Sequence, residues 1–128
     1  MPMTCEKHLY EYAVIRYMPR VEREEFINVG LIMMCKRNKW LRVMINFDER
    51  KIKVLGTECE LDTVKAQLQS FQEVADGKNH YSKDLAVHER FRWLTAVRSS
   101  CITTSRPHPG ICCDLNDTFE RLVRELVL

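Results

Sequence analysis

The side chains of this sequence that could carry chemistry are guanidinium, amide, carboxylate, hydroxyl and imidazole groups spread over both halves of the chain. Guanidinium, amide and hydroxyl groups donate hydrogen bonds, and carboxylates accept them. Arginine in particular recognises carboxylates and phosphates through paired hydrogen bonds. The candidate binding residues are Arg16, Glu25, Asn28, Arg98, Ser99, Ser105 and His108.

One hypothesis makes these residues a surface that binds a protein partner without catalysing a reaction. Arg16 and Asn28 would donate hydrogen bonds to the partner, and Glu25 would accept one. The segment 98–110 would form the rim of the surface. A homodimer is left open as well, because a sheet with one uncovered face often associates with a second copy.

A second hypothesis is a small enzyme or binder that acts on a phosphorylated or nucleotide ligand. Arg16, Arg98 and Ser99 would line a cleft and hold the anion, because guanidinium and hydroxyl groups donate to phosphate oxygens. Glu25 or His108 would then move a proton. This hypothesis requires the arginines to converge on one cleft.

A third hypothesis is a nucleic-acid-binding module built on a stretch that mixes cations with an aromatic ring. The stretch contains Arg90, Arg92, Trp93 and Arg98. Glu89 dilutes its charge, and an aromatic residue at helical spacing more often lies in the core. The formal net charge of +2 comes from 20 basic and 18 acidic residues that are interspersed, so the chain has no strong field to steer it to nucleic acid.

Other kinds of chemistry lack their sequence patterns. His108, Cys112 and Cys113 lie close together, but the paired Cys-x-x-Cys spacing typical of zinc sites is missing. There is no Gly-x-Ser-x-Gly motif for a nucleophile and no glycine-rich phosphate loop. The sequence therefore predicts neither metal nor cofactor, and it favours binding over catalysis.

Strands in the first half must position these residues. Tyr10 to Met18 and Trp40 to Phe47 are rich in β-branched and aromatic residues, and Phe26 to Cys35 is almost wholly apolar, which is typical of a central strand. Polar connections separate the three, so an antiparallel meander is expected. Ile52 to Leu55 fits either a fourth strand or a turn of helix.

Helices dominate the second half, because apolar residues recur there at helical spacing over about 61–75, 85–97 and 114–127. Residues 99–105 could add a strand, whereas Arg106 to Gly110 should be a loop because it contains two prolines. The predicted fold class is α+β, with an antiparallel meander of three to four strands packed on one face by about three helices. All of residues 1–128 should form a single domain.

The strand register predicts which side chains share a face of the sheet. The face toward the helices would carry Ile27, Val29, Leu31, Met33, Cys35, Leu41, Val43, Ile45 and Phe47. The opposite face would be either simply solvated or a binding surface, and it would carry Arg16, Asn28, Gly30, Arg42 and Asn46. Arg16 and Asn28 are neighbours if the first two strands form a hairpin. Gly30, inside an apolar strand, predicts a bulge or a close backbone approach.

Export and membrane signals are missing from the sequence. Met1 to Leu9 lacks an apolar signal region, and the longest apolar run, Val29 to Cys35, is too short to span a bilayer. We therefore expect a cytoplasmic protein without membrane contact. In that compartment its six cysteines should be free thiols.

Two groups of residues form signatures in a fixed order. The first comprises Tyr12 to Pro19 and Glu25 to Gly30. The second comprises Glu89 to Thr95, followed by Arg98, Ser99, Ser105, His108, Gly110, Leu122 and Val127. Together they resemble a bacterial family catalogued as domain of unknown function number 3037. The resemblance implies a bacterial protein often encoded beside a HipA-like kinase, and hence a partner or modulator of that kinase in a toxin–antitoxin or defence pair.

Overall fold

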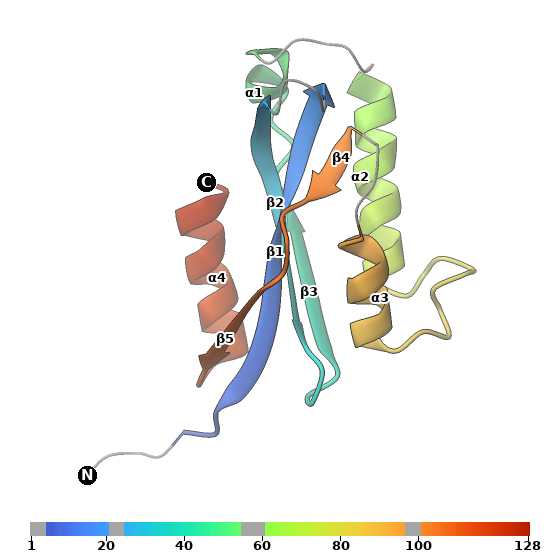
Figure 1. Ribbon diagram of the computed structural model, residues 1–128. Coiled ribbons are helices and arrows are strands. Elements are labelled where there is room, and N and C mark those ends of the chain that lie inside the picture. The colour runs from blue at the N-terminus through green and yellow to red at the C-terminus, as the bar shows by residue number, and fades with distance from the viewer. Residues whose placement is uncertain (1–4, 21–24, 55–60, 97–100) are drawn as a thin grey trace.

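The computed structural model describes residues 5–20, 25–54, 61–96 and 101–128. The chain is of the α+β class, as predicted (Figure 1). None of the helices in these ranges combines the length and the apolarity that crossing a bilayer requires. The elements in chain order are β1 (His8–Arg20), β2 (Glu25–Cys35), β3 (Trp40–Ile45), α1 (Glu49–Val54), α2 (Leu61–Ala75), α3 (Val87–Leu94), β4 (Ile102–Thr104), β5 (His108–Cys112) and α4 (Leu115–Leu126).

All five strands form one antiparallel sheet centred on β1. β3, β2 and β1 are neighbours in that order, which confirms the predicted meander. β4 and β5 both pair with the other edge of β1, one after the other along its length. The added strand expected within residues 99–105 is therefore present as β4.

β5 corrects one expectation, because part of the segment Arg106 to Gly110 is a strand. Pro109 lies opposite Glu11 and Gly110 lies opposite Tyr10 in the β1–β5 ladder. An edge strand needs ladder hydrogen bonds on one side only, so it can accommodate a proline that has no N–H. The prolines therefore mark an edge here and do not exclude a strand.

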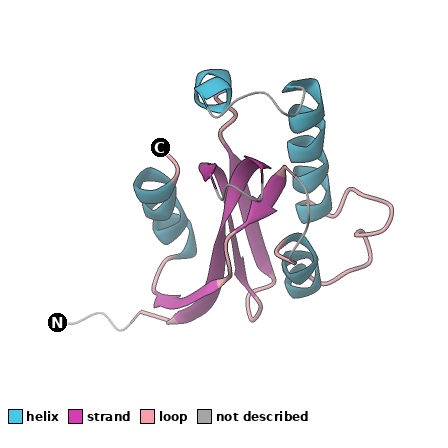
Figure 2. Cartoon of the chain, turned by 45° about the horizontal axis from the view of Figure 1, so that its top comes forward, coloured by secondary structure: helices cyan, strands magenta, loops and turns pink. Residues whose placement is uncertain are grey.

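The helices cover both faces of the sheet, whereas the sequence suggested one. α2 and α3 lie against one face and α4 lies against the other (Figures 1 and 2). The first core includes Ala13, Ile15, Tyr17, Val29, Ile32, Met34, Leu68, Phe71 and Phe91. The second includes Tyr10, Val14, Leu31, Met33, Cys35, Leu115, Phe119, Leu122 and Val123. The face expected to be uncovered is therefore a second packing surface.

A β-bulge in β2 explains how one apolar strand serves both cores. Ile15 pairs with Gly30, but the next residue, Arg16, pairs with Asn28, so Val29 is an extra residue in the ladder. The extra residue reverses the alternation of side chains between the two faces. The predicted common face is therefore divided: Ile27 and Val29 lie toward α2 and α3, and Leu31, Met33 and Cys35 lie toward α4.

Gly30 permits the close approach of β2 and β3 at this bulge. A Cβ atom at this position would lie 2.4 Å from the backbone oxygen of Met44 on β3 and 3.0 Å from Cδ1 of Ile15. Backbone cannot move aside as a flexible side chain can. The expectation that Gly30 marks a bulge and a close backbone approach is therefore confirmed.

The expectation of free thiols is wrong for part of the chain. Cys5 and Cys113 form a disulfide bond across 108 residues of sequence. The pairing of β1 with β5 brings them together, and the sequence did not reveal that pairing. Cys101 is disulfide-bonded as well, whereas Cys35 and Cys112 are free.

Candidate functional site at the end of the sheet beside α4

Arg16 and Asn28 lie side by side, as predicted, on the face of the sheet that α4 covers. They are register partners on β1 and β2, so their side chains share a face. Asn28 Nδ2 donates a hydrogen bond of 2.7 Å to the backbone oxygen of Leu126, in the last turn of α4. The pair therefore lies at the border of the area that α4 covers.

The polar atoms of this pair have partners only in part. The guanidinium carbon of Arg16 lies 4.1 Å from the ring centroid of Phe26, a cation–π contact. Arg16 Nε and Asn28 Oδ1 are both buried, and neither has a hydrogen-bond partner within the described ranges. The described part of the fold therefore leaves a donor on β1, Arg16 Nε, and an acceptor on β2, Asn28 Oδ1, without hydrogen bonds.

Arg42 provides an internal comparison on the same face. Its guanidinium carbon lies 4.5 Å from the ring centroid of Phe119 on α4. Its Nη1 donates to Asn116 Oδ1 at 3.0 Å, and its Nη2 lies 4.0 Å from Glu120 Oε1. Arg42 therefore links β3 to α4. Arg16 stacks on a ring in the same manner, but its Nε has no acceptor among the residues that the structure describes.

Phe26 is the residue of this site that sequence reasoning missed. Its ring is 40% exposed, although it stands in an apolar strand. The available signal was its spacing, because Phe26 and Asn28 are two residues apart and therefore share a face of β2. The structure thus combines an exposed ring, a guanidinium and an amide in one place.

Glu25 is exposed at the beginning of β2, where it pairs in register with Arg20. It is three residues, or about 10 Å along an extended strand, from Asn28. It therefore lies at the rim of the site and not beside Asn28. Arg98 and Ser99 lie outside the described residues.

Ser105 has a structural position in the sheet. Its Oγ accepts a hydrogen bond of 2.9 Å from the backbone N–H of Val14 and donates one of 3.1 Å to the backbone oxygen of Arg106. Its own N–H donates to the oxygen of Val14 at 2.9 Å. Ser105 thus fills the gap in the ladder of β1 between β4 and β5.

His108 belongs to a different part of the same sheet face. It is exposed, and its ring lies 5.3 Å from that of Tyr12, its register partner. Tyr12 is four residues from Arg16, which corresponds to about 13 Å along β1. The structure therefore brings Arg16 and Asn28 together but leaves His108 at a distance.

In the basic stretch considered for nucleic-acid binding, Arg90 makes hydrogen bonds within the fold. Arg90 Nη1 donates to the backbone oxygen of Ala75 at 2.8 Å, and its Nε donates to that of Leu85 at 3.1 Å. Arg90 thereby satisfies a carbonyl group in the last turn of α2. Trp93 lines a pocket beside α2, away from the site of Arg16.

Tyr10, which pairs with Gly110 of β5, has a perturbed ionisation. Burial raises the pKa of the Tyr10 hydroxyl above its ordinary value of 10.0, and the neighbouring Cys112 adds to this increase. A Cβ atom at Gly110 would lie 2.4 Å from the Tyr10 hydroxyl oxygen, so a larger residue there would require the Tyr10 ring to shift. Within the described ranges, no group of three or more His, Cys, Asp and Glu side chains is placed to hold a metal ion.

Comparison with known families gives a match over nearly the whole length of the chain. Residues 12–127 match the family described as "Protein of unknown function (DUF3037)". Searches of the curated proteins and of the solved structures find no match. The matched range includes both signatures recognised in the sequence and every residue of the site described above. The chain therefore belongs to the DUF3037 family.

Proposed function

We propose that this protein is a non-enzymatic binding module that holds a segment of a partner protein at the end of the sheet beside α4. The observation that supports this is the buried donor on Arg16 next to the buried acceptor on Asn28, neither with a partner within the described ranges. A buried polar atom without a partner costs about 1–3 kcal/mol. Two such atoms on adjacent strands indicate that a ligand supplies what the fold omits.

A peptide group has the required chemistry. Its carbonyl oxygen can accept from Arg16 Nε, and its N–H can donate to Asn28 Oδ1. Leu126 already holds the other amide atom of Asn28, so the Oδ1 atom has a defined orientation. The fold thus prepares the two hydrogen-bonding groups before the partner binds, which lowers the entropic cost of binding.

Phe26 would supply the apolar part of the interface. Its ring is 40% exposed and lies over the guanidinium of Arg16. Aromatic residues and arginine are enriched in the centres of protein interfaces, where they dominate the binding energy. Glu25, which is exposed at the beginning of β2, would lie at the rim.

The partner to test first is the HipA-like kinase that the family resemblance implies. The protein is mixed at micromolar concentration with a HipA-like kinase of the kind that the resemblance implies as a neighbour, and the mixture is analysed by size exclusion chromatography. A joint peak is expected, and two separate peaks would end the proposal. The protein alone, run on the same column, reports whether it forms a homodimer.

A pair of matched variants tests whether the partner binds at the site of Arg16. Arg16→Met should weaken the complex at least tenfold, because methionine can still cover Phe26 but cannot donate a hydrogen bond. Arg42→Met is the control, since Arg42 makes the same ring contact elsewhere on this face. Equal affinity of the two variants would contradict the proposal.

Unfolding experiments test the structural alternative, in which Arg16 and Asn28 serve only to hold the two strands together. Arg16→Met should cost less stability than Arg42→Met, because Arg42 loses a hydrogen bond to Asn116. In a double-mutant cycle with Asn28→Leu, a coupling free energy of about 1 kcal/mol or more would show that the two side chains stabilise each other. That result would leave no donor or acceptor for a partner.

A further inference from the structure

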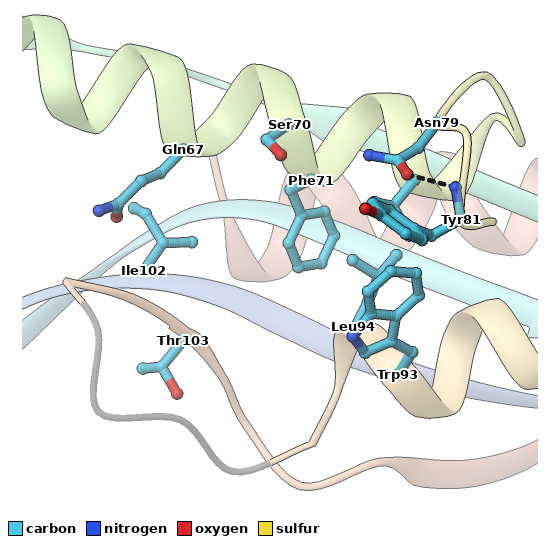
Figure 3. Close-up of a pocket in the computed structure, with 10 residues that line it drawn as sticks. Gln67, Ser70, Phe71, Asn79, Tyr81, Trp93, Leu94, Ile102 and Thr103 are labelled. Atoms are coloured by element: carbon cyan, nitrogen blue, oxygen red, sulfur yellow. Dashed lines mark hydrogen bonds between the residues drawn. The ribbon is translucent and has the colours of Figure 1, made fainter.

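A pocket of about 270 Å³ opens on the other side of the sheet, between α2, α3, the connection between them and β4 (Figure 3). Thr103 at its border is the register partner of Arg16, but the apolar wall of the pocket belongs to the core on the face opposite the Arg16 side chain, so binding here would not require the proposed function. The lining residues are Gln67, Ser70, Phe71, Val74, Asn79, Tyr81, Trp93, Leu94, Ile102 and Thr103.

Three aromatic rings, from α2, α3 and the connection between them, gather at one end of the pocket (Figure 3). Phe71 of α2 is almost fully buried and forms the wall, whereas Trp93 of α3 is 39% exposed and Tyr81 is 78% exposed. The backbone N–H of Tyr81 donates 2.8 Å to Asn79 Oδ1, which fixes the turn that carries the ring. Large exposed rings beside a pocket provide flat surfaces on which another ring can stack.

Polar groups are distributed along the same pocket. Gln67 lies at the end opposite Tyr81, and its Oε1 atom is buried with no hydrogen-bond partner in the part of the chain that the structure describes. Asn79 uses its Oδ1 atom to hold Tyr81, which leaves its amide nitrogen as a donor. Thr103 lies beyond Ile102 along β4, at the border of the pocket. A ligand here can both donate and accept hydrogen bonds.

Size and charge restrict the ligand further. None of the ten lining residues in the described ranges is charged, so these residues offer no cation to a phosphate and no anion to an amine. Its volume lies just below the range of about 300–1,000 Å³ that is usual for ligand sites, which suits a molecule of one or two fused rings.

We infer that this pocket binds a neutral, planar heteroaromatic ring that stacks on Trp93 and Tyr81 and donates an N–H hydrogen bond to Gln67 Oε1. The ring can belong to a purine nucleoside or to an indole, because both present a flat face and a ring or exocyclic N–H at the edge. Purines and indoles share a flat aromatic face and an N–H donor at the ring edge. The titration below distinguishes a purine ligand from an indole ligand.

The chain offers a reporter with an internal control. It has two tryptophans, of which Trp93 lines the pocket, whereas Trp40 packs against Phe119 on the other face of the sheet, with ring centroids 6.2 Å apart. Protein labelled with 5-fluorotryptophan therefore gives one ¹⁹F signal at the pocket and one away from it. The signals are assigned with a Trp40→Phe variant.

The titration uses adenosine, guanosine and indole-3-acetamide as probes. We expect a saturable shift of the Trp93 signal with a dissociation constant below about 1 mM, while the Trp40 signal stays in place. The probe with the lowest dissociation constant identifies the source of the ring. No saturable shift up to about 5 mM of any probe, or equal shifts of both signals, would overturn the inference.

Two glutamines of α2 make a matched pair of variants. Gln67→Leu keeps the side-chain volume and removes the acceptor, so it should weaken binding about fivefold to tenfold. Gln69→Leu is the control, because Gln69 is exposed and donates to Glu73 instead. Since Oε1 of Gln67 has no described partner to lose, Gln67→Leu should unfold no more easily than the parent. Equal affinity of the two variants would refute the assigned acceptor and the inference with it.

Discussion

Replacing Gly30 by alanine tests the geometry of the bulge on which the position of Asn28 depends. The added Cβ atom would lie 2.4 Å from the backbone oxygen of Met44. Close carbon–oxygen contacts between strands are normally about 3.3–3.6 Å long. β2 and β3 would therefore have to separate locally by about 1 Å, in the interior of a sheet that is covered on both faces.

The expected loss of stability follows from two opposing contributions. An extra methyl group in a packed core costs about 1–3 kcal/mol. Loss of glycine restricts the unfolded chain and returns about 0.4–1 kcal/mol. The net decrease in the free energy of unfolding is about 1–2 kcal/mol, or a melting temperature about 3–10 °C lower for a domain of this size.

Thermal and urea denaturation, followed by circular dichroism, measure this loss. A second variant separates the two contacts of the new methyl group, because Cδ1 of Ile15 lies 3.0 Å away and Ile15→Val removes it. If the Met44 backbone is the obstacle, Gly30→Ala should destabilise the Ile15→Val protein as much as it does the parent. Gly30→Ala with parental or higher stability, or complete rescue by Ile15→Val, would refute the reasoning.

Three further predictions concern residues that join β1 to the end of the chain. Ser105→Ala leaves the buried N–H of Val14 without its hydroxyl partner and should lower the free energy of unfolding by about 1–3 kcal/mol in urea denaturation; an unchanged midpoint would contradict the structural role. The pKa of Tyr10 is raised on folding, so above about pH 10 the unfolded chain loses this proton first and stability decreases as pH rises; Tyr10→Phe should flatten this decrease in pH-dependent melting curves, and parallel curves would count against it. Cys5→Ser opens the disulfide to Cys113, which closes a loop of 108 residues, and should lower the free energy of unfolding by up to about 4 kcal/mol; no difference from the parent under non-reducing conditions would show that the bond does not form.

Local patterns predicted the elements well, because their signals lie within a few neighbouring residues. The apolar spacing of Leu61 to Ala75 and of Leu115 to Leu126 identified α2 and α4 almost to the residue. The polar turn 36–39 located the hairpin of β2 and β3. Arg16 and Asn28 attracted attention because polar side chains inside strands lack an apolar explanation.

Features that depend on distant parts of the chain were not visible in the sequence. β2 is apolar on both sides, so its periodicity could not show that Val29 is an extra residue or that α4 covers the second face. β5 contains Pro109. Proline argues against a central strand but is tolerated in an edge strand, and the sequence does not show which of the two a segment will be. The bond between Cys5 and Cys113 depends on that strand and could not be inferred without it.

The central position of β1 has a consequence for the order in which the chain can fold. One edge of β1 is completed early by β2, but its other edge must await β4 and β5, and the hydrogen bond between Val14 and Ser105 spans 91 residues. Contacts of such long separation slow folding, because the entropy of closing the loop is lost before the contacts form. During synthesis the nascent hairpin therefore exposes an unsatisfied strand edge until residues 102–112 have left the ribosome. In that interval the edge can pair with another chain, and a holding chaperone would give its greatest benefit.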